Sequence, residues 1–260
     1  MDLGITSRHA IVCAGSSGIG LAAAHRFARE GAAVTIVARD PAKLACAAEA
    51  IAADTGASVT HFAADLSARA DREALLAAHP APDILVASPG IPQRSVAYTD
   101  LDEAAWRWWF EAHFHAAIDL IHGYAPGMCA RGFGRIVNVS ANFIKFPQAG
   151  AGPSHAARLA LAGAIASLVR EVAPRNVTIN SVLPGLIATP ALRAALSERA
   201  DALGVPYVDV EADVRKRCAA DRLASPEEAA DLIVMLCAAQ MGYVTGQNIV
   251  NDGGAYQGLF

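Results

Sequence analysis

The stretch CAGSSGIG, residues 13–20, decides the fold of this chain. An apolar run at 9–14 leads into it and has the length and composition of a buried strand. Apolar residues at helical spacing follow it, namely Ile19, Ala23 and Phe27. Unpaired amides at the start of that helix, together with the positive end of its dipole, would face the turn and attract an anion. Because glycines let a pyrophosphate approach the backbone closely, the stretch predicts a nucleotide site.

Beyond this turn, apolar runs of strand length alternate with helical stretches. Further strands are expected at 33–38, 58–63, 83–87, 134–139, 178–183 and 248–251. Helices are expected at 41–55, over about ten residues after 65–66, at 102–130 with a break at 126–127, at 154–173 and at 226–238. This alternation predicts an α/β fold of one domain, 1–260, with a doubly wound parallel sheet and helices on both faces. Residues 189–217 are amphipathic and less regular, and we expect them to form a substrate lid.

Composition and charge exclude several kinds of protein. The chain has 260 residues, 54% of them apolar, and a formal net charge of −4. Scattered basic residues do not favour nucleic acid. The chain shows no apolar signal segment, and its apolar helical run at 159–169 is shorter than the ~20 residues that cross a bilayer. Its five cysteines form no C-x-x-C pair. We therefore expect a cytoplasmic protein with reduced thiols and no metal, nucleic acid or membrane partner.

Several stretches together resemble the short-chain dehydrogenase/reductase family, over nearly the whole chain. They are CAGSSGIG (13–20), Asp65, DILVASPG (83–90), GRIVNVS (134–140), INSVLPGLIAT (179–189) and YVTGQNIVNDGG (243–254). The resemblance implies a Rossmann fold and a nicotinamide cofactor. The family's loop reads T-G-x-x-x-G-x-G, so Cys13 replaces the threonine and Ala14 replaces the first glycine.

The residue after the second strand indicates which cofactor is used. Arg39 stands where family members that use NADP often carry a base, and Ala38 stands where NAD users carry an acid. A guanidinium can grip a 2′-phosphate with two hydrogen bonds, whereas an acid would repel it. The resemblance therefore implies NADP(H) in preference to NAD(H). The alternative is a solvent-exposed arginine at a strand end.

Two further features belong to the implied cofactor site. Asp65 would accept a hydrogen bond from the adenine amino group, although it could equally cap the helix that follows. Residues 184–189 match the family's P-G-x-x-x-T, which holds the nicotinamide carboxamide. The full set of cofactor-binding residues that the resemblance implies is Ala14, Gly15, Ser16, Ser17, Gly18, Ile19, Gly20, Arg39, Asp65, Leu66, Ser88, Gly90, Arg158, Pro184, Gly185, Ile187 and Thr189.

The catalytic positions depart from the family. A typical member uses an Asn, a Ser and a Tyr-x-x-x-Lys pair to reduce a carbonyl. Here Ser154 and Arg158 replace the Tyr and Lys, and their spacing keeps both on one helix face. The Ser position falls on Ala141, with Ser140 one residue before it, and the Asn position falls on His113. We therefore consider Ser154, Arg158, Ser140 and His113 the catalytic candidates, in a pattern similar to a divergent 3-oxoacyl-acyl-carrier-protein reductase-like branch.

The source of the proton is left open by these substitutions. An aliphatic hydroxyl is a far weaker acid than a phenol, whose pKa is ~10, and an arginine does not readily shuttle protons. His113 could act as acid or relay, or could be a core histidine. His155 and Tyr98 are further candidates, whereas Lys145 is expected at the surface or against substrate.

Three functions follow from these residues. The first is an NADP(H)-dependent oxidoreductase acting on a small carbonyl or alcohol substrate. The second is a non-redox nucleotide-binding protein, either regulatory or an inactive partner subunit, and the third is a lyase or isomerase that uses His113. Segments 189–217 and 91–101 would set the substrate, and the apolar helices at 102–130 and 159–169 suit a homodimer or homotetramer.

Overall fold

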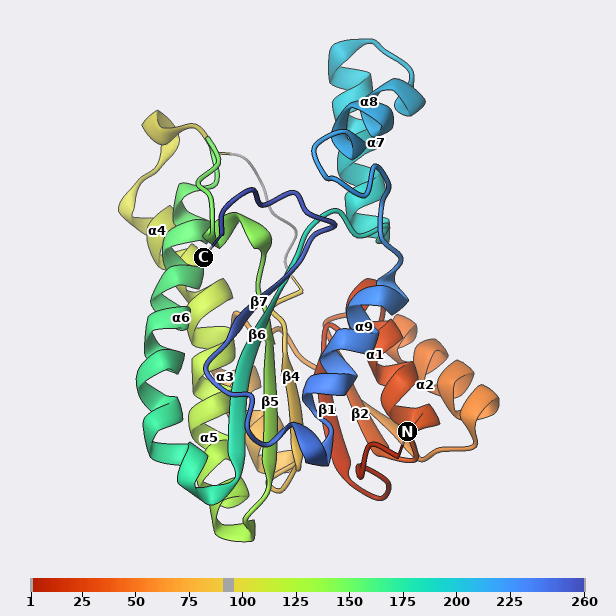
Figure 1. Ribbon diagram of the computed structural model, residues 1–260, viewed down its shortest axis with the longest axis vertical. Coiled ribbons are helices and arrows are strands. Elements are labelled where there is room, and N and C mark those ends of the chain that lie inside the picture. The colour runs from red at the N-terminus through yellow and green to blue at the C-terminus, as the bar shows by residue number, and fades with distance from the viewer. Residues whose placement is uncertain (1, 91–95, 260) are drawn as a thin grey trace.

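The computed structural model describes residues 2–90 and 96–259, in which a sheet of parallel strands forms the centre (Figure 1). The strands are β1 (His9–Cys13), β2 (Ala33–Ala38), β3 (Val59–Ala63), β4 (Ile84–Ala87), β5 (Gly134–Val139), β6 (Val177–Pro184) and β7 (Asn248–Asn251). Their order across the 7-stranded sheet is β3-β2-β1-β4-β5-β6-β7, and all neighbours run parallel. This confirms the doubly wound Rossmann-like sheet. The order reverses between β1 and β4, and such a switch point places a ligand crevice at the carboxyl ends of the strands.

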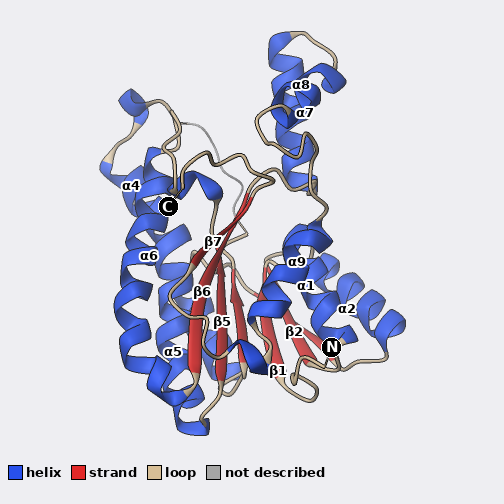
Figure 2. Ribbon diagram, in the orientation of Figure 1, coloured by secondary structure: helices blue, strands red, loops and turns tan. Residues whose placement is uncertain are grey.

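Helices cover both faces of this sheet (Figure 2). One face carries α1 (Gly18–Arg29), α2 (Pro41–Thr55) and α9 (Pro226–Leu236). The other carries α3 (Arg69–Ala78), α5 (Ala116–Arg131) and α6 (Gly152–Val172), with α4 (Glu103–Phe110) beside α6. Within the described part of the chain, no helix is long and apolar enough to cross a membrane.

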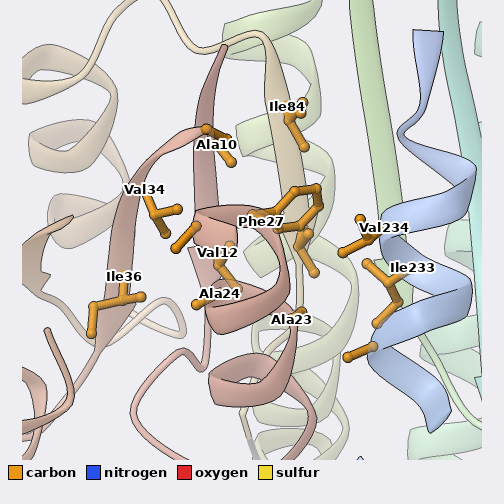
Figure 3. Close-up of a cluster of buried hydrophobic side chains, with 14 of the residues drawn as sticks. Ala10, Val12, Ala23, Ala24, Phe27, Val34, Ile36, Ile84, Ile233 and Val234 are labelled. Carbon is orange, nitrogen blue, oxygen red and sulfur yellow. The ribbon is translucent and has the colours of Figure 1, made fainter. Parts of the chain in front are cut away.

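Alternation along the strands builds one core on each face. In β1, Val12 belongs to the core under α1 and α9, whereas Ile11 belongs to the core under α5 and α6. Figure 3 shows Phe27 of α1 among the strand side chains, with Ile233 of α9 nearby. Burying a large apolar side chain such as Phe27 contributes about 1.5–3 kcal/mol. These two cores hold the strand ends that form the site.

The long helix predicted at 102–130 differs from expectation in where it is irregular. The break predicted at 126–127 was wrong, because α5 runs through Pro126 to Arg131. Pro126 and His122, one turn earlier, are both exposed, so the carbonyl that loses its partner can bind water instead. The irregularity is a π-helical turn, Glu111–His115, between α4 and α5. Such turns insert one residue into a helix and often occur at functional sites.

Residues 189–217 are more regular than predicted. They form α7 (Pro190–Leu203) and α8 (Tyr207–Arg215), which project beyond the carboxyl edge of the sheet (Figure 1). The two helices share a small core of their own, made of Leu196, Ala200, Val210 and Val214. In the second segment expected to contact substrate, residues 91–95 lie outside the described residues, and Tyr98 is 87% exposed.

Candidate active site

A groove of about 600 Å³ follows the carboxyl edge of the sheet and collects most of the predicted cofactor residues. Those that line it are Ala14, Ser16, Ser17, Gly18, Ile19, Gly20, Arg39, Asp65, Leu66, Ser88, Gly90, Arg158 and Thr189. Four predicted residues lie outside its lining, namely Gly15, Pro184, Gly185 and Ile187. The groove therefore joins segments that are far apart in the sequence, as the strand order requires.

The glycine-rich turn is shaped by backbone contacts that leave no room for side chains. A Cβ at Gly20 would lie 2.3 Å from the carbonyl oxygen of Ala14. Gly15 lies beneath the turn, where a Cβ would come within 2.7 Å of the Ile36 side chain. Ala14 itself has φ +55°, in the left-handed region that favours glycine. The substitution of Ala for Gly at this position therefore carries backbone strain.

The start of α1 is open to an anion. Its N-cap residue, Ser17, makes no side-chain hydrogen bond to the helix, and no acidic residue occupies the first turn. The first amides of the helix are therefore not satisfied by a side-chain cap, as they are in α2, where Asp40 accepts hydrogen bonds from Ala42 and Lys43. Free amides and the helix dipole at the groove suit a phosphate group.

Arg39 and Asp65 lie at the end of the groove next to β2 and β3, which we call its outer end; the end next to β5 is its inner end. Arg39 is exposed, and no described residue forms an ion pair with it. Burial opposes ionisation of Asp65, but hydrogen bonds from Ser67 and the charge of Arg39 outweigh it and lower the pKa of the carboxyl. Asp65 Oδ1 accepts from the amide and hydroxyl of Ser67 at 3.0 and 2.7 Å. The alternative that Asp65 caps the following helix is wrong, because α3 begins at Arg69 with Ala68 as its N-cap and no side-chain cap. Oδ1 instead holds the turn at 65–67, while Oδ2 accepts no hydrogen bond from a described residue.

The segment after β6 supports the groove more than it lines it. The amide of Gly185 donates to Asn251, and Ile187 forms a bridge with Ala224. Thr189 lines the groove and caps α7, since its Oγ1 accepts from the Leu192 amide at 3.2 Å. Its hydroxyl proton is still free to be donated to a ligand.

Two of the four predicted catalytic residues, Ser140 and Arg158, line the inner end of the groove, after β5, whereas Ser154 and His113 do not line it. Ser140 follows β5 and lines the groove, and its buried Oγ has no hydrogen-bond partner among the described residues. Ser154 and Arg158 lie one turn apart on α6, and Arg158 Nε donates to Ser154 Oγ at 3.3 Å. Ser154 is 1% exposed and lies behind Arg158, outside the lining of the groove.

Arg158 is a buried cation without a counter-ion. It is 9% exposed, and no carboxylate of the described residues lies within ion-pair distance of it. Burial lowers the pKa of the guanidinium to about 10, so it keeps its charge at neutral pH. The centroid of the Phe143 ring is 5.8 Å from the Arg158 Cζ. A buried, unpaired charge is costly, so the arrangement indicates a ligand.

His113 is buried in the π turn, which packs against α6. Its ring stacks on Trp109 at a centroid distance of 5.2 Å, and neither ring nitrogen has a partner among the described residues. Burial, helped by the charge of Arg158, lowers the pKa of His113 to about 3. The ring is therefore neutral at neutral pH, and it differs from a core histidine whose nitrogens are hydrogen-bonded.

Arg72 of α3 was missed by the sequence reasoning. It is 2% exposed and donates to Glu111 at 3.0 Å, to Asp119 at 2.9 Å and to the carbonyl of Leu66 at 2.9 Å. Arg72 thereby links the π turn to Leu66, which lines the groove. Its signal in the sequence was a charged residue three positions from Leu75 on the buried stripe of α3.

The other proton-donor candidates lie away from this cluster. His155 lies against Phe143, with ring centroids 6.1 Å apart, and does not line the groove. Tyr98 and Lys145 are exposed. Among the described residues, no group of His, Cys, Asp and Glu is placed to hold a metal ion.

Comparison with known proteins gives matches along nearly the whole chain. The family pattern described as enoyl-(acyl carrier protein) reductase matches residues 13–256. Dehydrogenase/reductase SDR family member 4 from Oryctolagus cuniculus is 31% identical over 255 residues, which cover 96% of this chain and 94% of the relative. The matched region contains the glycine-rich turn, the groove and the candidate catalytic cluster.

Solved structures of similar proteins match this chain over nearly its whole length. L-sorbose reductase from Gluconobacter frateurii, complexed with NADPH and L-sorbose, has a TM-score of 0.95 and 31% identity, with 100% of both chains covered. An NADPH-bound short chain oxidoreductase from Pseudomonas aeruginosa PAO1 contains an atypical catalytic center. It has a TM-score of 0.87 and 27% identity, covering 98% of this chain and 99% of its own.

Proposed function

The chain belongs to the short-chain dehydrogenase/reductase family, and from that premise we propose that it is an NADP(H)-dependent oxidoreductase that interconverts a small carbonyl compound and its alcohol. The observation that carries the proposal is the groove, which has free helix amides at its middle, an unpaired Arg39 at one end and an unpaired Arg158 at the other. These groups match a dinucleotide with a pyrophosphate, a 2′-phosphate and a ribose.

The chain's own residues fit NADP(H) at several points. The amides at the start of α1 would bind the pyrophosphate, and close backbone packing at Gly20 keeps the turn free of side chains. Arg39 would bind the 2′-phosphate, and Ala38 removes the acid that would repel it. Oδ2 of Asp65 is available to the adenine amino group. Thr189 would donate to the nicotinamide carboxamide.

We propose that the four usual catalytic side chains of the family are replaced here by Ser140, Ser154, Arg158 and His113. The cofactor supplies the hydride. Ser140 Oγ, which has no partner, would donate to the carbonyl oxygen, and Arg158 would bind ribose while its charge stabilises negative charge on that oxygen. Ser154 holds Arg158 in place through its hydroxyl.

Proton delivery follows from the same geometry. A hydroxyl is a weak acid, and His113 is neutral, so neither stores a proton for the product at neutral pH. We propose that the proton comes from water in the groove, and that His113, which is enclosed and does not line the groove, contributes through a water held between its ring and Arg158. Turnover would then be fastest on carbonyls that are already activated toward hydride.

Two structural expectations extend the proposal. Helices α7 and α8 follow directly from groove-lining Thr189, and we propose that they form the substrate lid. Trp108 and Leu159 are 45% and 44% exposed on the neighbouring helices α4 and α6. This apolar surface supports pairing with a second copy of the chain.

The second candidate function is NADP(H) binding without redox activity, and the weak acidity of Ser154 and His113 is the observation that favours it. Since neither Ser154 nor His113 is a good proton donor, the chain could bind NADP(H) without redox turnover. The experiment is to titrate NADPH and NADH by fluorescence, and then to follow NADPH oxidation with ketones, quinones and β-ketoacyl thioesters. Saturable NADPH binding with turnover is expected.

The outcomes separate the alternatives. Binding without oxidation on any carbonyl would favour the non-redox protein, and absence of binding would refute the cofactor assignment. Where turnover is observed, His113→Ala and Ser154→Ala should each slow it, with NADPH affinity nearly retained in His113→Ala. Unchanged rates in both variants would remove these residues from the mechanism.

A further inference from the structure

The guanidinium of Arg158 has donors that nothing in the described chain uses. Of its five N–H groups, the structure assigns one, from Nε to Ser154 Oγ at 3.3 Å. The terminal nitrogens make no hydrogen bond to a described residue, and they are not among the enclosed atoms without partners, so they open into the groove. Up to four N–H donors of Arg158 are therefore left for a ligand in the groove.

The groove's own carboxylates do not neutralise this charge. Asp40 caps α2 and pairs with Lys43 at 3.7 Å, and Asp65 is engaged by Ser67. Both follow the outer strands β2 and β3, whereas Arg158 of α6 lies near Phe143, in the segment that follows β5. Since β3 and β5 are four strands apart at ~4.8 Å per strand, Asp65 is roughly 19 Å away from this end.

A ribose alone would leave part of this donor set unused. Ribose hydroxyls are neutral and would take one or two of the four N–H groups, so the charge would still lack an anion. A carboxylate matches the planar fork of an arginine with two parallel hydrogen bonds. The partnerless hydroxyl of Ser140 lines the same groove and is free to donate to a neutral oxygen.

We infer that the substrate is a 2-oxo acid, whose carboxylate pairs with Arg158 while Ser140 donates to the adjacent carbonyl oxygen. The inference rests on the proposed function. A hydride passes from NADPH to the carbonyl carbon, the carbonyl oxygen takes a proton from water, the hydroxide that remains is protonated by solvent, and a 2-hydroxy acid and NADP⁺ leave. Pairing with Arg158 also offsets the negative charge of the carboxylate, which would otherwise oppose the negative charge that develops on the carbonyl oxygen.

The test compares a charged substrate with its neutral methyl ester, which is the more electrophilic ketone. Wild-type protein is given NADPH with phenylpyruvate or with its methyl ester, and the ratio of the two kcat/KM values is measured. We expect the acid to be favoured about 100-fold, as is typical of a buried charge pair, and the preference to fall below about threefold in Arg158→Gln. Arg170→Gln, an exposed arginine of the same helix, is the matched control and should keep the wild-type ratio.

A second measurement does not depend on turnover. Oxamate, an unreactive analogue of a 2-oxo acid, is titrated by calorimetry into the wild-type protein saturated with NADP⁺, and into Arg158→Gln. Binding to wild type that is lost in the variant supports the inference. Equal reduction of acid and ester, or no oxamate binding to wild type, overturns it while the proposed function stands. Failure of the proposed function is recognised separately, by the absence of NADPH binding.

Discussion

Two arginines at opposite edges of the sheet show how differently this molecule treats buried charge. Arg135, at the amino end of β5, donates to the carbonyls of Gly134, Asn176, Ala238 and Ala239 and to the Asn176 side chain, at 2.8–3.2 Å. It also lies 4.5 Å from the centre of the Phe133 ring. Arg158, at the carboxyl edge, makes one hydrogen bond, to Ser154.

This difference indicates that the network around Arg135 stabilises the fold, whereas the region around Arg158 is suited to bind a ligand. Buried polar groups in folded proteins are nearly always hydrogen-bonded, so a cluster that is not marks a place where something else binds. At the carboxyl edge, Ser140 and His113 also lack partners among the described residues. The same edge is where doubly wound sheets bind their ligands.

The largest expected change in stability follows from replacing Arg135, at the amino edge of the sheet. Replacing Arg135 by Met would leave several buried carbonyls without donors, and we expect the free energy of unfolding to fall by about 3–5 kcal/mol. Urea denaturation at neutral pH measures it. Turnover per folded molecule should stay at the wild-type level, because Arg135 is far from the groove. A loss below about 1 kcal/mol would show that this network does not stabilise the fold.

The next largest effect is the contribution of His113 to the loss of folding stability at low pH. The pKa of His113 is about 3 in the folded protein and 6.5 ordinarily. Below pH 6.5 the histidine therefore binds a proton in the unfolded chain but stays neutral in the folded protein. Stability is therefore lost as pH falls, by about 3 kcal/mol between pH 6.5 and about pH 4. In His113→Phe, which keeps the stacking on Trp109, this part of the loss should vanish. Parallel stability curves for the two proteins would contradict the buried, neutral histidine.

Arg39 tests the outer end of the groove. Arg39→Ala should raise the dissociation constant of NADPH about 30-fold, or about 2 kcal/mol, and change that of NADH less than about twofold. Lys43→Ala is a suitable control, because Lys43 already pairs with Asp40 and should contribute less. Calorimetric titration of the wild type and both variants with each cofactor measures these dissociation constants. If Arg39→Ala weakens both cofactors equally, it does not contact a 2′-phosphate.

The smallest effect is expected in the glycine-rich turn. Ala14 has φ +55°, so Ala14→Gly relieves about 1–2 kcal/mol of strain but loses up to about 1 kcal/mol to the freer unfolded chain. We expect a net gain of about 0.5 kcal/mol in unfolding free energy. Gly18→Ala is the matched opposite, since Gly18 has the same φ and a Cβ would lie 3.0 Å from Thr189. A gain from Gly18→Ala would refute the strain argument.

Elements with a strong local signal were predictable from the sequence. The bounds predicted for α2, with Pro41 at its first turn, and for β2 and β5, with their apolar runs, agree with the structure. The π turn at 111–115 was not predictable, because it is stabilised by Arg72, Glu111 and Asp119, which meet only in three dimensions. The exposure of His122 likewise decided that α5 continues through Pro126.

The site divides in the same way. Spacing and resemblance placed the glycine-rich turn, Arg39 and Thr189, and the structure brings these residues into one groove. The missing partner of Arg158 could not be foreseen, since a counter-ion may come from any part of the chain. Nor could the sequence show that Asp65 serves its own turn with one oxygen and leaves the other available.

The most direct test of this account is the stability of Arg158→Met in the absence of any ligand, measured by urea denaturation beside the wild type. If Arg158 is kept for a ligand, removing an unpaired buried charge should leave the free energy of unfolding unchanged or raise it by about 1–2 kcal/mol. A fall of about 3 kcal/mol or more, like that expected for Arg135→Met, would show that Arg158 holds the fold and would contradict the account.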